Sequence, residues 1–243
     1  MRIAVEIAVQ DVAGVRIALA EGADRIELSS ALGMGGLTPS AALIRQAVRL
    51  ARESDREGFV QVLVRPRGGG FVYDADELAT TLADVRFARE AGAAGVVIGA
   101  LTEAAHVDAE AVRRIVAEAG PLQVTFHRAM DVVADPFDAA EALIALGVTR
   151  VLTSGRASRS IDGVATLGAL SQAAAGRVEV MAGGGVSVDD ILALAATGID
   201  AVHLSARDTA RGAPSGPGGG DAVYDITDPA TVHDAIAMAA LAR

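Results

Sequence analysis

Residues 2–30 read RIAVEIAVQDVAGVRIALAEGADRIELSS and contain two strand-like segments on either side of a helix-like one. The segments at 2–8 and 24–30 are rich in apolar and β-branched residues, as strands are. Between them, residues 11–21 carry apolar side chains at helical spacing and end at Gly22, a residue typical of helix ends. The stretch therefore predicts a strand–helix–strand unit whose two strands run parallel.

The same alternation continues to the end of the chain. It predicts further strands at 59–66, 95–100, 122–128, 149–154, 177–183 and 199–205. It predicts further helices at 38–53, 74–90, 108–118, 136–146, 160–175, 187–197 and 228–241. Eight such pairs in 243 residues favour an α/β protein with a single TIM-barrel domain spanning 1–243, because a (β/α)8 barrel typically takes about 250 residues. An open doubly wound sheet is the alternative, but it would normally begin with a glycine-rich turn where this chain has Val9-Gln10-Asp11.

Composition restricts the functional classes. The chain has 31 acidic and 21 basic side chains and a formal net charge of −10, which argues against a nucleic-acid-binding protein. It has no cysteine, which excludes disulfides, thiolate metal sites and a cysteine nucleophile. No apolar run reaches the roughly 18 residues of a membrane helix, and residues 1–9 lack a signal-peptide pattern. We expect a cytoplasmic protein that contacts no membrane.

One low-complexity stretch interrupts the pattern. Residues 206–226, ARDTARGAPSGPGGGDAVYDI, follow the eighth predicted strand and are rich in glycine and proline. We expect a long loop on the face of the barrel where active sites form, either functional or mobile. The alternative is a disordered tether to the last helix.

The alternation of side chains along each strand predicts which ones enter the barrel. In the second strand, Ile26 and Leu28 suit the helix layer, so Glu27 points inward. The same rule gives a set of inward candidate catalytic residues near the ends of their strands: Glu6, Glu27, His127 and His203. Strand ends converge at one mouth of a TIM barrel, so we expect Glu27 to reach Arg65 or His127 there. The alternative is a structural salt-bridge network that closes the barrel.

Two loops suggest that the mouth binds an anion. RPRGGGF (65–71) places Arg65 and Arg67 beside a glycine run, and guanidinium groups bind carboxylates and phosphates well. After the seventh and eighth strands stand three further candidates: Gly183, Gly184 and Ser205. Many barrels hold a phosphate with these two loops. A small anionic molecule is therefore the expected ligand.

A metal site is chemically conceivable but is not specified by the pattern. The two histidines and two glutamates of the candidate catalytic set could together ligate a transition metal. Nothing in their spacing requires a metal, and Arg65 nearby would oppose a cation. The metal ligands therefore stay undetermined.

Seven motifs, taken in order, resemble the CutC family, which is named for copper homeostasis. They are GADRIELSS (22–30), GGLTPS (35–40), RPRGGGF (65–71), GPLQVTFHRAMD (120–131), RVLTSG (150–155), MAGGGV (181–186) and AVHLSA (201–206). The resemblance covers roughly residues 1–206. It implies a TIM barrel, a cytosolic homodimer or larger homo-oligomer, and a role in copper tolerance or copper handling, with copper as the implied bound metal.

The chain departs from the family at one point and keeps its polar barrel mouth. Family members often carry cysteines just after the glutamates of the first two strands, where this chain has Ile7-Ala8-Val9 and Leu28-Ser29-Ser30. A thiolate copper site therefore does not carry over, and only Met34, Met130 and Met181 remain as soft ligands. The resemblance adds four residues to the anion-binding candidates: Arg128, Asp131, Thr153 and Ser154.

Two functions of different class follow. One is a copper-homeostasis factor that handles copper without a thiolate site. The other is an enzyme that acts on a small phosphorylated or polyhydroxylated metabolite by glutamate and histidine acid–base chemistry. In that enzyme Glu27 would exchange a proton, His127 or His203 would be its partner, and Arg65 and Arg67 would hold the anion.

Overall fold

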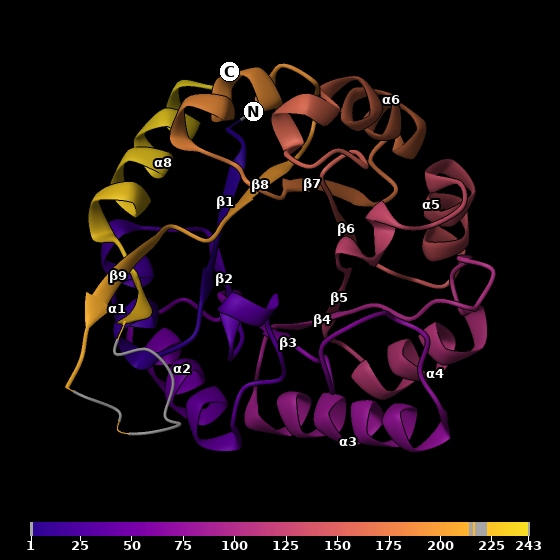
Figure 1. Cartoon of the computed structure of the whole chain (residues 1–243), viewed down its shortest axis with the longest axis horizontal. Coiled ribbons are helices and arrows are strands. Elements are labelled where there is room, and N and C mark those ends of the chain that lie inside the picture. Colours follow the sequence, from indigo (N-terminus) through magenta and orange to yellow (C-terminus); the bar gives the residue numbers. More distant parts are fainter. Residues whose placement is uncertain (1, 214–215, 217–222, 243) are drawn as a thin grey trace.

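In a computed structural model, the described residues are 2–213, 216 and 223–242. Eight parallel strands close into a barrel in chain order, and the helices form a ring around it (Figure 1). The strands are β1 (Ala4–Val9), β2 (Arg25–Leu28), β3 (Val60–Leu63), β4 (Gly95–Ile98), β5 (Gln123–Phe126), β6 (Arg150–Thr153), β7 (Glu179–Gly183) and β8 (Ala201–Leu204). The TIM-barrel prediction is confirmed.

Each strand is followed by a helix that packs on its outside. The α-helices are α1 (Val12–Glu21), α2 (Ala41–Glu53), α3 (Ala75–Ala91), α4 (Ala109–Ala119), α5 (Pro136–Ala145), α6 (Val164–Ala174), α7 (Ile191–Ala195) and α8 (Pro229–Leu241). Four short 3₁₀ turns precede some of them: η1 (Leu32–Met34), η2 (Arg128–Asp131), η3 (Ser160–Gly163) and η4 (Val188–Asp190). Among the described residues, no helix is long and apolar enough to cross a membrane.

Local sequence signals set the ends of these helices. The Asp11 side chain accepts the Gly14 N–H at the start of α1, and Gly22 ends that helix at a φ of 84°. The helix predicted at 187–197 is shorter and divided into η4 and α7. Its first turn begins at Ser187, whose backbone N–H donates to the Asp190 carboxylate at 2.9 Å.

The alternation along β2 separates two interior layers. Ile26 and Leu28 are completely buried in the outer layer between strands and helices. Arg25 and Glu27 point into the barrel. The Arg25 side chain contacts Glu6 of β1 and Met181 of β7. The registers of the ladder set their depth, since Arg25 lies opposite Glu6 and Glu27 lies opposite Ala8. The barrel interior thus has a lower layer of charges and an upper layer at the mouth.

The stretch after β8 corrects the expectation of a loop at 206–226. Strands β9 (Arg207–Arg211) and β10 (Val223–Thr227) pair as an antiparallel ribbon, at the left in Figure 1. The glycine and proline residues that suggested a loop lie between the two strands, and 214–215 and 217–222 lie outside the described residues. The flanking segments are free of both residues, so they can form strands.

Candidate active site at the mouth of the barrel

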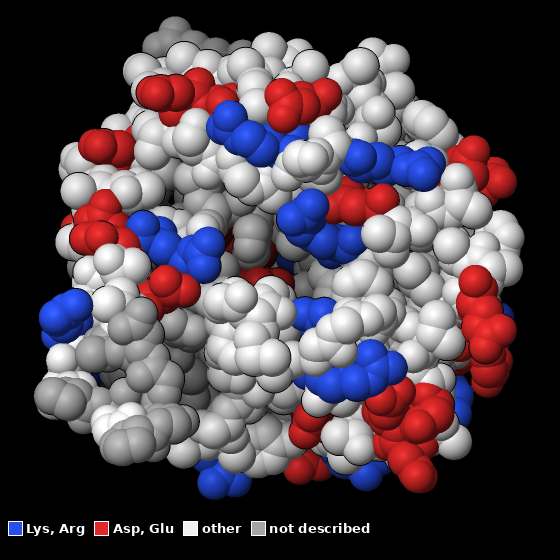
Figure 2. Space-filling model, in the orientation of Figure 1, with Lys and Arg blue, Asp and Glu red and all other residues white. Residues whose placement is uncertain are grey.

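A cavity of about 240 Å³ opens at the carboxyl ends of the barrel strands. Figure 2 shows this face hollowed near its centre, with acidic groups inside the hollow and basic groups around it. The cavity is lined by Ala8, Glu27, Leu32, Gly35, Leu63, Arg65, Phe71, His127, Arg128, Leu152, Gly184, Gly185, Val186, His203, Ser205 and Arg207. Residues from seven barrel strands and the loops that follow them therefore meet in one place, as the topology of the barrel requires.

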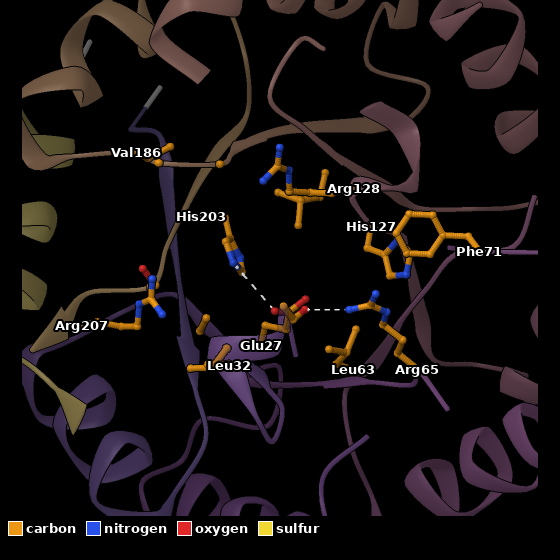
Figure 3. Close-up of a pocket in the computed structure, with 16 residues that line it drawn as sticks. Glu27, Leu32, Leu63, Arg65, Phe71, His127, Arg128, Val186, His203 and Arg207 are labelled. Carbon is orange, nitrogen blue, oxygen red and sulfur yellow. Dashed lines mark hydrogen bonds and ion pairs between the residues drawn. The ribbon is translucent and has the colours of Figure 1, made fainter. Parts of the chain in front are cut away.

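Glu27 stands at the bottom of this cavity. Burial, together with the negative charge of Glu6, raises the pKa of its carboxyl from 4.5 to about 7, although His203 opposes the rise. Its carboxylate oxygen Oε2 lies 3.8 Å from Nε2 of His203 (Figure 3). The basic partner is therefore His203, which corrects the expectation that Glu27 would pair with Arg65 or His127.

His203 lies between two carboxylates. Its Nδ1 is 2.8 Å from Oε1 of Glu6, and its Nε2 faces Glu27. Burial lowers the pKa of the imidazole, but the charge of Glu27 and the contact with Glu6 outweigh burial and raise it. A protonated imidazole in this position stabilises the carboxylate of Glu6 below it and the carboxylate of Glu27 beside the cavity.

Glu6 belongs to the layer beneath the site. It is completely buried and does not line the cavity, which corrects its assignment as a catalytic residue in contact with a ligand. Burial opposes its ionisation, but His203 and the Arg25 guanidinium, whose Nε is 2.7 Å away, hold its pKa at about 2. Arg25 also pairs with Glu179, and Glu179 pairs with Arg150 at 2.9 Å. This buried ion network supports His203 from below.

Arg65 offers a positive charge at the cavity wall. Its guanidinium donates to the carbonyl groups of Gly35, Gly36 and Gly69 at 3.3, 3.2 and 2.8 Å. It also lies 5.3 Å from the ring centre of Phe71. Within the described residues no carboxylate forms an ion pair with Arg65, so backbone carbonyls hold the group in place without neutralising its charge.

Arg67 has a different environment. Its side chain pairs with Glu77, with Nη2 3.1 Å from Oε2, and it donates to the Val72 carbonyl. It does not line the cavity, which corrects its assignment to an anion clamp. The cause is local, because β3 ends at Leu63 and the glycine-rich loop then turns Arg67 toward α3.

His127 is a neutral histidine at the cavity wall. Burial and the nearby Arg65 charge lower the pKa of its imidazole to about 3. Its Nδ1 accepts the Ala129 N–H at 3.1 Å, and its ring lies 4.8 Å from that of Phe71. Gly99 makes room for the ring, since a Cβ at that position would overlap it. Only glycine therefore leaves the imidazole where it stands.

Arg128 lines the cavity across from Arg65, with its guanidinium directed toward the segment of Val186 (Figure 3). Its Nε donates to Asp131 at 2.7 Å, and Asp131 in turn accepts Thr153 Oγ1 at 2.6 Å and the Ser154 N–H at 2.8 Å. Asp131, Thr153 and Ser154 do not line the cavity, so they position Arg128 and do not meet a ligand. A Cβ on Gly184 would lie 2.9 Å from the Arg128 Cζ, which explains the glycine there.

Of the remaining predicted site residues, some line the cavity and one lies beneath it. Gly184 and Ser205 line the cavity, whereas Gly183 packs against Leu152 and His203 below it. Sequence reasoning missed Phe71 and Arg207. Phe71 ends the RPRGGGF motif, and its proximity to two predicted residues could have identified it. Arg207 belongs to the unpredicted ribbon, where it lies 3.1 Å from Asp225.

The donor set does not suit copper. Within residues 2–213, 216 and 223–242, no three His, Cys, Asp or Glu side chains cluster to hold a metal ion. The methionines are dispersed, with Met34 65% exposed and Met130 and Met181 completely buried in the core. A tight Cu(I) site needs converging soft ligands, which this mouth lacks.

Comparisons with known proteins identify the family. The model of the CutC family matches residues 3–208. The chain belongs to the CutC family. A CutC family protein of Xylella fastidiosa (strain 9a5c) is 44% identical over 233 residues, which cover 92% of this chain and 84% of that protein. The human copper homeostasis protein cutC homolog is 42% identical over 208 residues, covering 84% and 73% of the two chains.

Solved structures agree with this assignment. The crystal structure of CutC from Streptococcus agalactiae has a TM-score of 0.79 at 32% identity and covers 84% of this chain and 98% of that one. A thiamine phosphate pyrophosphorylase from Pyrococcus furiosus has a TM-score of 0.62 at 16% identity and covers 98% of this chain and 96% of that one. At 16% identity, the similarity to the pyrophosphorylase shows a shared fold alone.

Proposed function

We propose that this CutC family member is an enzyme that binds a small anionic metabolite at the barrel mouth and transfers a proton through Glu27. One observation carries the proposal: the buried carboxyl of Glu27, whose pKa burial raises to about 7, lines the same cavity as the Arg65 guanidinium, which has no carboxylate partner among the described residues. A carboxyl poised near neutral pH can both accept and return a proton, which is what general acid–base catalysis requires.

The basic groups of the mouth support an anionic ligand. Arg128 and the backbone at Gly184 and Gly185 form one wall, and Arg65 belongs to another. Guanidinium groups and close backbone approach are suited to a phosphate or carboxylate. Because Glu27 lies at the bottom, the anionic group of the metabolite would stay near Arg128 and its reactive carbon would lie above Glu27.

The dimensions of the cavity support a small substrate. A volume of about 240 Å³ is roughly the share of eight water molecules in the liquid. Both polar and apolar residues line it, and Leu32, Leu63 and Leu152 belong to the apolar part. This suits a phosphorylated or polyhydroxylated metabolite of a few carbon atoms.

A metabolite extract incubated with the protein tests this proposal. Wild type, Glu27→Gln and Glu90→Gln are compared by chromatography and mass spectrometry; exposed Glu90 on α3 provides the matched control. We expect at least one anionic compound to be converted by wild type and by Glu90→Gln but not by Glu27→Gln. Conversion that survives in Glu27→Gln, or none by wild type, would contradict the proposal.

A second candidate function comes from the relatives. The human relative is named a copper homeostasis protein cutC homolog, so we propose that this chain also acts in cytoplasmic copper tolerance, without a thiolate site and as a homo-oligomer. A host strain that lacks its own CutC protein would be grown in copper with wild type or Glu27→Gln. Restored growth supports the role, and the comparison shows whether tolerance depends on the cavity. Light scattering on the purified protein tests the oligomer.

A further inference from the structure

The hydrogen bond at Nδ1 fixes the tautomer of His127. A backbone N–H can only donate, so the Ala129 amide, 3.1 Å away, requires an unprotonated Nδ1. A neutral ring has one proton, which must then be on Nε2. This Nε2 is buried and has no hydrogen-bond partner within the described residues. The ring therefore presents a donor that the protein itself does not satisfy.

Arg65 lies beside this donor and lines the same cavity. Its own Nε is buried near the hydroxyl of Tyr73, which can accept a hydrogen bond from Arg65, so Arg65 contributes its charge to the cavity. Phe71 contacts both groups, with its ring 4.8 Å from the His127 ring and 5.3 Å from the Arg65 Cζ. Buried donors are rarely left unpaired, so the His127 Nε2 beside the Arg65 charge indicates a missing acceptor oxygen.

Glu27 completes the arrangement, because Figure 3 shows its carboxylate pointing into the cavity that Arg65 and His127 line. We propose that the substrate is an anionic α-hydroxy aldehyde or ketone, and that the enzyme moves a proton between its carbonyl carbon and the neighbouring carbon that bears the hydroxyl. This inference rests on the proposed function. Arg65 and His127 hold the carbonyl oxygen, and Glu27 removes the proton from the adjacent carbon.

The electrons and protons of this step balance within the substrate. Glu27 takes the proton, the C–H electron pair forms a carbon–carbon double bond, and the carbonyl π pair moves to oxygen to give an enediolate. Glu27 then returns its proton to the former carbonyl carbon while the hydroxyl proton moves between the two oxygens. No oxidant, reductant or metal takes part. A buried carboxylate base opposite a neutral imidazole donor is a recurring arrangement for such proton transfers.

The charge states on the two sides of the cavity suit these roles. His127 stays neutral, so its N–H can stabilise a developing oxyanion without first losing a proton to it. Arg65 supplies the full positive charge beside it. Glu27 is ionised above about pH 7 and so can act as the base there. Arg128, on the far side, is left for the anionic group.

Solvent deuterium exchange tests the inference. The probes are dihydroxyacetone phosphate and hydroxypyruvate, which pair a carbonyl with a phosphate or a carboxylate, and glycerol phosphate, which has no carbonyl. Calorimetry measures binding, and proton NMR in D₂O measures loss of the C–H signal next to the carbonyl. We expect wild type to exchange the C–H next to the carbonyl of at least one carbonyl probe. The exchange rate should be about 10²–10⁴-fold lower in identically prepared Glu27→Gln and unchanged in Glu90→Gln.

Two variants of His127 test its role as an N–H donor. His127→Leu removes it and is expected to slow exchange by about 10²–10³-fold, whereas His127→Gln retains an N–H and recovers part of the rate. If the leucine variant does not fold, ¹⁵N NMR of the wild-type imidazoles still decides. A protonated Nε2 on His127 is expected, and a protonated Nδ1 would overturn the assignment.

The outcomes separate the two proposals. A carbonyl probe that binds wild type without exchanging overturns the enolisation chemistry and leaves the proposed function standing. Exchange that proceeds equally fast in Glu27→Gln or His127→Leu also overturns it. If none of the three anions binds, the anionic-metabolite function fails, and this inference fails with it.

Discussion

Replacing His203 by glutamine removes the imidazole whose positive charge lowers the pKa of Glu27. The 3.8 Å between Nε2 and the Glu27 Oε2 corresponds to an attraction of about 4 kcal/mol at an effective dielectric constant of about 20. Since about 1.4 kcal/mol changes a pKa by one, the substitution can raise the pKa of Glu27 by up to about three. Water that enters the space left by the imidazole reduces the effect, so we expect a rise of about one to three, from a starting value of about 7.

Carbon-13 NMR of the glutamate carboxyl groups measures this pKa directly. The Glu27 resonance is assigned by its loss in Glu27→Gln and then titrated in wild type and in His203→Gln. His233→Gln is the matched control, because exposed His233 pairs with Glu21 at 3.0 Å, away from the cavity. Any activity that needs ionised Glu27 should shift to higher pH by the same amount. A Glu27 pKa that stays unchanged or falls in His203→Gln would refute the electrostatic reasoning.

Three further predictions concern copper, anion binding and stability. In competition with a strong Cu(I) chelator, the protein should leave the metal on the chelator, and stoichiometric retention would contradict the donor-set argument. Crystals grown in sulfate should show the anion at Arg128 and Gly184, and Arg128→Ala should weaken sulfate binding by about tenfold or more in calorimetry. Stability at pH 8 should rise by about 3 kcal/mol in Glu27→Gln, because the raised pKa of Glu27 makes wild type lose stability between about pH 4.5 and 7. It should fall by about 3 kcal/mol in Glu6→Gln, whose lowered pKa contributes stability that is lost between about pH 4.5 and 2; urea unfolding would check both.

The sequence predicted the fold and much of the cavity because both depend on short-range regularities. Side chains alternate with a period of two along a strand, so apolar Ile26 and Leu28 dictate that Glu27 enters the barrel. Strand ends converge in a closed barrel, so His127 and His203 had to meet Glu27 near one mouth. No long-range information is needed for either step.

Depth within the barrel could not be predicted in the same way. It depends on the stagger between neighbouring strands, which pairs Glu6 with Arg25 and Ala8 with Glu27. Alternation alone placed both glutamates inside and could not assign them to different layers. Arg67 was misplaced for a related reason, because it lies beyond the end of β3, where alternation no longer directs side chains.

The stagger has a chemical consequence. Two buried glutamates of the same barrel acquire pKa values of about 2 and about 7, because close contacts with His203 and Arg25 outweigh burial at Glu6, whereas burial outweighs the 3.8 Å contact with His203 at Glu27. Glu27 and Glu6 together raise the pKa of His203, and the charge of His203 in turn limits how far burial raises the pKa of Glu27. A structural network that only closed the barrel would pair every carboxylate strongly. Here the ion pairing is strong in the lower layer and weak at the cavity, as the proposed proton transfer by Glu27 requires.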